Sequence, residues 1–279
     1  MQVQVQAERQ EAALMSELND LALRFARLCS AAGLVVMDIY GSGTFVRAKA
    51  DSSPVTEADK RAEAVLLAGL AELLPGVTVV AEEAVSAHGL PEVGAEFVLV
   101  DPLDGTKEFL SHNGEFTVNI GLVRDGVPVA GCVFAPAREA VFLGGTSART
   151  APLRPGKRVD PSQLREVRTR PYPADGLVAV TSRSHLDPTT KAFLERLRPR
   201  STTDAGSSLK LCLIAQGSAD VYPRFAPTME WDIAAGDAVV RAAGGTVVDA
   251  DGVTLRYGKT QTGFRNTSFI AWGGRPLDV

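Results

Sequence analysis

The chain has few of the residues that build disulfide-rich or metal-thiolate proteins. Its 279 residues include three cysteines, Cys29, Cys132 and Cys212, and no CxxC pair. Their odd number, wide spacing and apolar surroundings argue against a disulfide framework and indicate reduced core residues of a cytoplasmic protein. Histidine is also scarce, and its three positions show neither metal-ligand spacing nor a Ser/His/Asp pattern.

Positive charge is not in excess, since 29 Lys and Arg residues face 33 Asp and Glu residues, for a net charge of −4. Nucleic-acid and membrane-surface binding both need a positive field, so no nucleic-acid partner is expected. No apolar run approaches the length that spans a bilayer, and the N-terminus lacks the basic and apolar segments of a signal peptide. We therefore expect no stable membrane anchor, and the sequence leaves the oligomeric state open.

Hydrophobic residues make up 45% of the chain, enough to bury a large core. We expect two tightly joined halves, an N-terminal α+β half at 1–150 and a C-terminal α/β half at 151–279. Residues 149–175 are rich in proline and locally basic, so we interpret them as the connection between the halves. Their charge is typical of a solvated surface.

Leucine and phenylalanine recur at 4-3-4-3 spacing near the N-terminus and predict a long helix at about 8–39. A loop at 41–54 follows, and a second helix is expected from Thr56 to just before Pro75. Strands are predicted at 77–81, 97–101, 115–123, 127–134, 140–143, 177–181, 219–222, 246–249 and 268–272. Further helices are predicted at 188–199, 207–216 and 232–243. Strands that alternate with helices favour a layered α/β architecture.

Acidic residues follow two neighbouring predicted strands. Glu82 ends one strand, and Asp101 and Asp104 end the next, within the segment VDPLDGT. Carboxylates at the end of a buried strand are costly to desolvate without a cation, and a hard cation prefers oxygen ligands such as these and the Leu103 carbonyl. Gly105 then lets the backbone approach a phosphate closely. The alternative for each acid is an ordinary loop residue or helix cap.

Two more acids stand at predicted helix starts. Asp59 completes a capping box with Thr56, and it could equally face the acid cluster. Asp232 occupies an N-cap position before the small-residue helix IAAGDAVVRAAGG, where a carboxylate could cap the helix or close the metal cluster.

Candidate anion-binding residues lie in the second half. Ser207 and Lys210 open a predicted helix, whose free N–H groups favour an anion, and Arg224 follows a strand fourteen residues after Lys210. His185 is the one histidine near other polar candidates, and it could equally be a loop residue.

Three motifs in order, EE at 82–83, DPLDGT at 101–106 and WDIAAG at 231–236, resemble the signature of the inositol monophosphatase superfamily of metal-dependent phosphatases. The resemblance covers nearly the whole chain and implies a five-layer αβαβα sandwich. It also implies two or three Mg²⁺ ions in an all-oxygen site. The implied ligands are Glu82, Asp101, the Leu103 carbonyl, Asp104, Asp232 and, in addition, Asp59.

Within the superfamily, KADSSPVTEAD at 49–59, GEFTVNIGLV at 114–123 and GSSLK at 206–210 resemble the 3′(2′),5′-bisphosphate nucleotidases. The resemblance implies hydrolysis of 3′-phosphoadenosine 5′-phosphate to AMP by a metal-activated water, a step of sulfur metabolism. It assigns catalysis to Asp59, Thr106 and Glu82, and phosphate binding to the N–H groups of Gly105 and Thr106. It assigns nucleotide contacts to His185, Ser207, Lys210 and Arg224.

Two alternatives stay open. One is a different phosphatase of the same fold, acting on inositol monophosphate or fructose 1,6-bisphosphate. The other is a non-catalytic protein that binds a cation or a nucleotide. Thr106 and Asp59 beside the ligands argue against the second, because a binding module has no need of a group that activates water.

Overall fold

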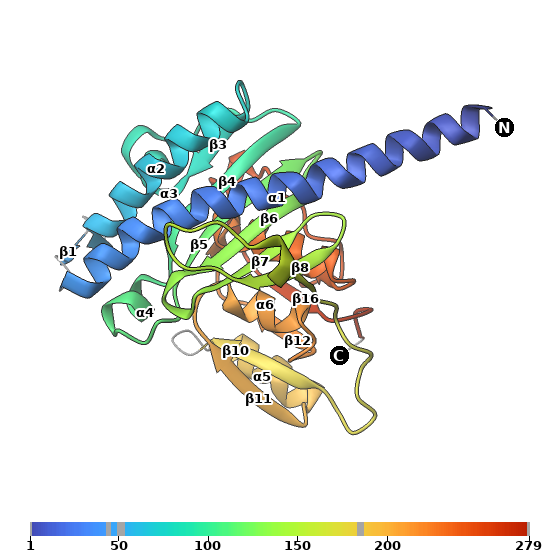
Figure 1. Cartoon of the computed structure of the whole chain (residues 1–279). Coiled ribbons are helices and arrows are strands. Elements are labelled where there is room, and N and C mark those ends of the chain that lie inside the picture. Colours follow the sequence, from blue (N-terminus) through green and yellow to red (C-terminus); the bar gives the residue numbers. More distant parts are fainter. Residues whose placement is uncertain (1, 43–45, 49–53, 183–186, 278–279) are drawn as a thin grey trace.

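The computed structural model describes residues 2–42, 46–48, 54–182 and 187–277, with side chains described for 16–41, 57–182 and 187–277 (Figure 1). Helices and sheets alternate in five layers. The expected αβαβα sandwich is therefore confirmed.

The first layer consists of two helices that lie side by side, α1 (Gln2–Ser42) and α2 (Glu57–Leu73) (Figure 1). The leucine and phenylalanine pattern predicted α1 because these side chains, among them Leu21 and Phe25, are buried against the sheet. The loop expected at 41–54 was partly wrong. It contains β1 (Val46–Ala48) and ends at β2 (Pro54–Thr56), which pair antiparallel, while 43–45 and 49–53 lie outside the described residues.

The second layer is a seven-stranded sheet in the order β3-β4-β5-β6-β7-β8-β9. Its strands are β3 (Thr78–Ala81), β4 (Glu96–Asp104), β5 (Thr117–Arg124), β6 (Val127–Ala135), β7 (Ala140–Gly144), β8 (Ala148–Pro152) and β9 (Arg165–Glu166). The connection predicted at 149–175 thus contributes two strands. Their short, polar sequences lack the apolar alternation that marks a strand. The boundary placed at residue 150 falls within β8, and the division into two halves stays a prediction.

The remaining layers come from the second part of the chain. Two helices, α6 (Leu209–Ala215) and α7 (Glu230–Ala242), cover the sheet face opposite α1. Beyond them lies a five-stranded sheet in the order β11-β10-β12-β16-β14, and α5 (Pro188–Leu197) covers its outer face. The strands are β10 (Val178–Ser182), β11 (Ser201–Ala205), β12 (Val221–Arg224), β14 (Thr246–Val248) and β16 (Phe269–Trp272). A small pair, β13 (Thr228–Met229) with β15 (Arg265–Asn266), and two short helices, α3 (Glu82–His88) and α4 (Thr106–Leu110), complete the surroundings of the site.

A row of glycines lets α7 lie close to the large sheet. Gly121, Gly131 and Gly144 are register partners on β5, β6 and β7. A Cβ atom on Gly131 would lie 2.5 Å from the Ala235 carbonyl oxygen, and one on Gly144 would lie 2.6 Å from the Ala238 carbonyl carbon. Because these glycines carry no side chain, α7 can lie this close to the sheet. The short distance between helix and sheet also sets the position of the acid at the start of that helix.

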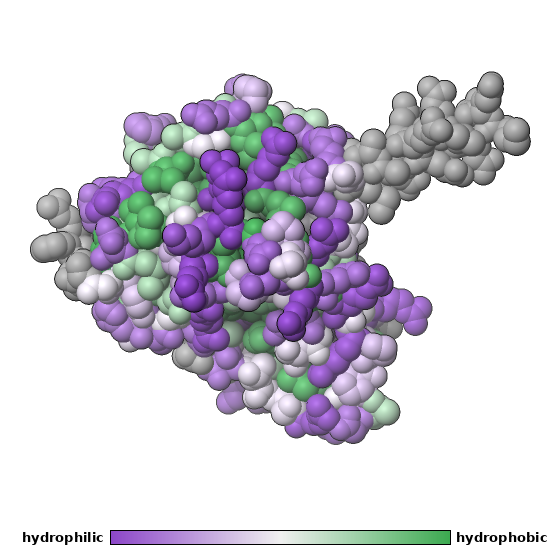
Figure 2. All heavy atoms as spheres, viewed as in Figure 1, coloured by the Kyte–Doolittle hydropathy of each residue, from purple (hydrophilic) through white to green (hydrophobic). Residues whose placement is uncertain are grey.

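The drawn surface is mixed, and the cysteines lie in the interior. On the face drawn in Figure 2, hydrophobic residues form scattered areas among hydrophilic ones. Among the described residues, no helix is both long and apolar enough to cross a membrane. All three cysteines are free and buried, as expected.

Candidate active site

The ends of β3 and β4 bring the first acids together. The two strands are parallel, with Ala81 opposite Val100, so Glu82 and Asp101 follow at the same edge of the sheet. A bulge lies between Asp101, opposite Asn119, and Asp104, opposite Thr117. In a regular strand two residues three positions apart face opposite sides, and the extra residue of the bulge removes that constraint.

Asp101 lies at the electrostatic centre of the acids. Its carboxyl is buried, and its Oδ1 accepts a hydrogen bond from the Leu103 N–H at 3.0 Å. Burial raises the pKa of Asp101 well above its ordinary value, and repulsion from Glu82, Asp104, Asp232 and Asp59 raises it further. A cation among these groups would offset both effects.

Asp232 joins this cluster from α7, the helix that packs against the large sheet. The expectation that it is the N-cap of its helix was wrong: α7 begins at Glu230, and Asp232 stands at the third helical position. Its Oδ2 accepts a hydrogen bond from the Met229 N–H at 2.9 Å and another from the Thr228 hydroxyl. Burial, followed by the charge of Asp104, raises the pKa of Asp232 to about 6, although these two bonds and Arg224 oppose the shift.

Asp104 is held by the turn that precedes α6. Its Oδ2 accepts from the Ser207 hydroxyl at 2.6 Å, the Ser208 N–H at 2.7 Å and the Ser208 hydroxyl at 3.0 Å. The Ser208 hydroxyl has a single proton, which it shares between Asp104 Oδ2 and the Asp232 carbonyl oxygen, 2.7 Å away. The anion site expected at this helix start thus faces a carboxylate of the protein itself.

These elements enclose a cavity of about 240 Å³. Its acidic lining residues are Asp59, Glu82, Asp104, Glu108 and Asp232. Its basic lining residues are Lys107, Lys210 and Arg224. The others are Gly105, Thr106, Ser182, Ser207, Ser208, Leu211, Tyr222, Thr228 and Ile233. One cavity therefore holds both a group of carboxylates and a group of cations.

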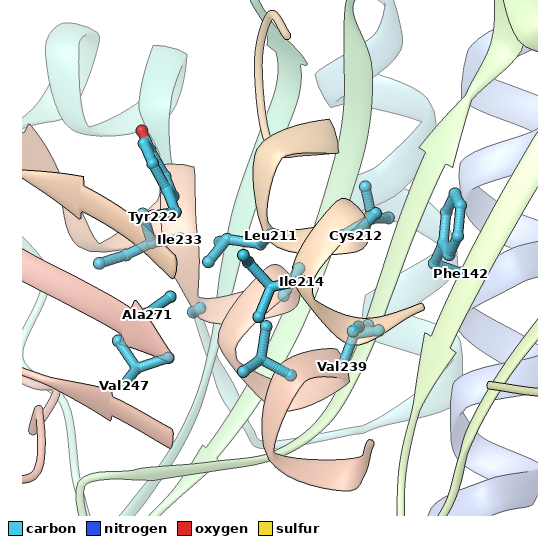
Figure 3. Close-up of a cluster of buried hydrophobic side chains, with 14 of the residues drawn as sticks. Phe142, Leu211, Cys212, Ile214, Tyr222, Ile233, Val239, Val247 and Ala271 are labelled. Carbon is cyan, nitrogen blue, oxygen red and sulfur yellow. The ribbon is translucent and has the colours of Figure 1, made fainter. Parts of the chain in front are cut away.

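Two of the cations, Lys210 and Arg224, lie beside an aromatic side chain at the edge of the core. Tyr222 packs with Ile233 at one end of the apolar cluster in Figure 3, with its hydroxyl directed away from that cluster. Lys210 is 5% exposed, and its Nζ lies 5.5 Å from the centroid of the Tyr222 ring. Arg224 donates to the carbonyl oxygens of Ala226 and Pro227 at 3.4 and 3.3 Å. Burial lowers the pKa of Arg224, but Tyr222, Asp232 and Asp104 raise it more, so the guanidinium stays charged.

Most residues predicted from the sequence line this cavity. Asp101 and Leu103 are buried but do not line it, and His185 lies outside the described residues. The sequence analysis gave no site role to Ser182, Ser208, Tyr222 or Thr228. Ser208 belongs to the segment GSSLK, and the other three lie within four residues of His185, Arg224 or Asp232, so proximity to a predicted site residue was the available signal.

The donor chemistry fits a hard cation. Among the described residues, no three Asp, Glu, His or Cys side chains are grouped tightly enough, in their present positions, to hold a metal ion. The carboxylates of Asp59, Glu82, Asp104 and Asp232 nevertheless face one cavity, and oxygen is the donor that Mg²⁺ prefers. We therefore consider the lining suited to Mg²⁺ rather than to a softer metal.

The layered fold and the acidic cavity define the class of protein. The chain belongs to the inositol monophosphatase family, whose model matches residues 18–271. Members of this family depend on a metal, typically Mg²⁺.

Particular relatives are more informative. The 3′(2′),5′-bisphosphate nucleotidase CysQ of Salmonella typhimurium is 41% identical over 251 residues, which cover 87% of this chain and 98% of the relative. The protein of the same name from Escherichia coli (strain K12) is 42% identical over 246 residues, with 87% and 96% covered. The crystal structure of CysQ from Bacteroides thetaiotaomicron matches with a TM-score of 0.77 at 36% identity, over 92% of this chain and 98% of that one. An inositol monophosphatase from Zymomonas mobilis, at 24% identity and a TM-score of 0.71, shares the fold.

Proposed function

We propose that this protein is a Mg²⁺-dependent phosphomonoesterase that hydrolyses 3′-phosphoadenosine 5′-phosphate to AMP and phosphate. One observation carries the proposal: carboxylates suited to Mg²⁺ and the cations Lys210 and Arg224 line the same cavity. Hydrolysis of a phosphomonoester needs the metal that the carboxylates would hold. A second phosphate on the substrate would bind to the cations. The nucleotidase relatives support this choice of substrate.

The carboxylates would hold the metal. In this proposal the ligands are Glu82, Asp101, the Leu103 carbonyl, Asp104 and Asp232. When bound, Mg²⁺ would supply a water of lowered pKa and stabilise the leaving oxygen. Two or three ions per site follow from the family resemblance.

The residues beside the ligands would act on water and phosphate. Asp59 and Thr106 orient the attacking water, and a carboxylate in this position accepts its proton. The N–H groups of Gly105 and Thr106 bind the phosphate that is removed. Gly105 has a φ of 92°, a conformation that favours glycine, and this conformation turns the chain directly after Asp104.

The second phosphate and the nucleotide would lie at the basic end of the cavity. Ser207, Lys210 and Arg224 are the proposed contacts, together with His185. An inositol monophosphate has only one phosphate, so it does not require two further cations. Fructose 1,6-bisphosphate also has a second phosphate, and here the nucleotidase relatives favour the adenosine bisphosphate.

A phosphate-release panel tests the proposal. The purified protein with Mg²⁺ is given 3′-phosphoadenosine 5′-phosphate, inositol 1-phosphate or fructose 1,6-bisphosphate, with an excess of EDTA as the metal control. We expect the adenosine bisphosphate to have the highest kcat/KM and EDTA to abolish release. A higher kcat/KM for inositol 1-phosphate would contradict the substrate, and Mg²⁺ binding without turnover of any substrate would indicate a binding protein. We also propose that the protein is cytoplasmic, because its three cysteines are free and buried.

A further inference from the structure

A buried carboxylate outside the predicted site connects the two parts of the chain. Glu115 lies just before β5, within the segment GEFTVNIGLV, and its Oε2 accepts a hydrogen bond from the Gly206 N–H at 2.8 Å. Its Oε1 accepts from Arg138 at 2.6 Å. The Glu115 side chain is 8% exposed and that of Arg138 is 49% exposed, so this ion pair reaches from the surface to the interior.

The turn that Glu115 contacts has little freedom. A Cβ atom on Gly206 would lie 2.5 Å from Glu108 Cγ and 2.7 Å from the Glu115 carbonyl oxygen, so only glycine fits there. Ser207 has a φ of 54°, a left-handed conformation that a serine adopts only when its surroundings impose it. Its hydroxyl lies 2.5 Å from the Thr117 hydroxyl. The turn is therefore held in a strained shape from several sides.

The same turn directs Asp104. The Ser207 hydroxyl and the Ser208 N–H donate to Asp104 Oδ2 at 2.6 and 2.7 Å, and the Ser208 hydroxyl, whose proton also faces the Asp232 carbonyl oxygen, lies 3.0 Å from Oδ2. With Oδ2 engaged in this way, Oδ1 is the oxygen that Asp104 can offer to a cation. A change in the turn would therefore rotate the carboxylate of Asp104 and alter its ability to bind a metal.

We propose that Glu115, charge-paired with Arg138, is a positioning residue that aligns the Gly206–Ser208 turn on Asp104. The proposal rests on the proposed function, because it assigns Glu115 a part in Mg²⁺ affinity. Outer partners of metal ligands orient them in this manner in many metal sites. Glu115 acts through the turn, and it is not itself a ligand.

The test compares matched variants by Mg²⁺ binding without substrate. Titration calorimetry gives the affinity for Mg²⁺ alone, and thermal melting in EDTA gives the stability of the fold. The variants are Glu115→Ala, Glu115→Gln, Arg138→Leu and Arg138→Lys. Arg154→Leu is the control, because Arg154 forms an exposed pair with Glu139 at 3.4 Å, outside the residues that line the cavity.

We expect Glu115→Ala to weaken Mg²⁺ binding by about 10- to 100-fold, the usual range for loss of an outer partner of a metal ligand. Glu115→Gln keeps an oxygen that can accept from the Gly206 N–H but loses the charge, so we expect an intermediate loss. Arg138→Leu should resemble Glu115→Gln, Arg138→Lys should recover most of the affinity, and Arg154→Leu should match the wild type. Because the glutamine variant is nearly isosteric, it keeps the test decisive where the alanine variant unfolds.

A double-mutant cycle shows whether Glu115 acts through the turn. Ser208→Ala removes a donor to Asp104, and we expect its effect on Mg²⁺ affinity to be non-additive with that of Glu115→Gln. Variants with a lowered melting temperature and the Mg²⁺ affinity of the wild type would overturn the proposal and leave Glu115 a purely structural residue. A wild-type protein that binds no Mg²⁺ and releases no phosphate would overturn the proposed function as well.

Discussion

The ammonium group of Lys210 lies 5.5 Å from the centroid of the Tyr222 ring, in a position where the lysine is almost fully buried. A cation–π contact is worth about 0.5–2 kcal/mol, less than the cost of burying an ammonium ion. Tyr222 is itself held by an edge-on contact with Phe269, at a ring distance of 5.3 Å. Lys210 also lines the cavity, so its ammonium group is placed where it can bind an anion.

Replacement of Lys210 by methionine should therefore reduce activity without a loss of stability. The methionine fills similar space and removes the buried charge. We expect kcat/KM for 3′-phosphoadenosine 5′-phosphate to fall by at least about tenfold, as for a lost charge-assisted hydrogen bond, with an unchanged or higher melting temperature. The exposed Lys191 on α5, replaced in the same way, is the control. An unchanged kcat/KM in Lys210→Met would exclude Lys210 from substrate binding.

Replacement of Asp101 by asparagine should separate stability from catalysis. Burial and four neighbouring acids raise the pKa of Asp101, so the neutral amide relieves repulsion in the metal-free protein. We expect Asp101→Asn to melt at a higher temperature in EDTA than the wild type and to lose turnover with Mg²⁺. Wild-type rates in this variant, measured by phosphate release, would contradict the metal site.

Replacement of Thr106 by alanine tests the activation of water. The change keeps every proposed carboxylate ligand. We expect kcat to fall by roughly 10²–10⁴-fold, the scale of lost acid–base assistance, with Mg²⁺ affinity little changed. The outcome that would make Thr106 a structural residue is a loss of Mg²⁺ binding with normal kcat at saturating Mg²⁺.

Replacement of Arg224 by glutamate distinguishes the nucleotidase from a sugar phosphatase. The guanidinium is fixed by the carbonyl oxygens of Ala226 and Pro227, so its charge is held at the basic end of the cavity. We expect kcat/KM for 3′-phosphoadenosine 5′-phosphate to fall by at least about tenfold, while inositol 1-phosphate hydrolysis stays equal or improves. Equal losses on both substrates, in steady-state assays, would favour a general sugar phosphatase.

The response of stability to pH tests the position of Asp232. Its pKa of about 6 in the folded protein exceeds the ordinary 3.8, so the folded protein holds this proton more tightly than the unfolded chain. The stability that results is fully present below about pH 3.8 and is lost as the pH rises through about 6. Mg²⁺ needs the ionised carboxylate, so its stabilising effect should be large at pH 8 and small at pH 5.

Thermal melting in EDTA and in Mg²⁺ at these two pH values measures this effect. Asp232→Asn is the control, and we expect its melting temperature to depend less on pH and on Mg²⁺. An increase caused by Mg²⁺ that is equal at both pH values would show that the protonation of Asp232 does not control metal binding.

The sequence by itself predicted the main elements and most of the acids and cations that line the cavity. Leucines that recur at the spacing of helical turns predicted α1, because one face of that helix is buried. The end of an apolar strand predicted the position of Asp101. These features are local, because each depends on residues within a few positions along the chain.

Only the tertiary structure decided how the acids are oriented and held. The bulge that brings Asp101 and Asp104 to one edge depends on the pairing of β4 with β5. Asp232 is held at the third position of α7 by Thr228 and Met229, a detail that a cap pattern does not distinguish from the N-cap. Glu115 meets Gly206 across 91 residues of sequence. Contacts of this length arise when layers pack together, so no short window of sequence contains them.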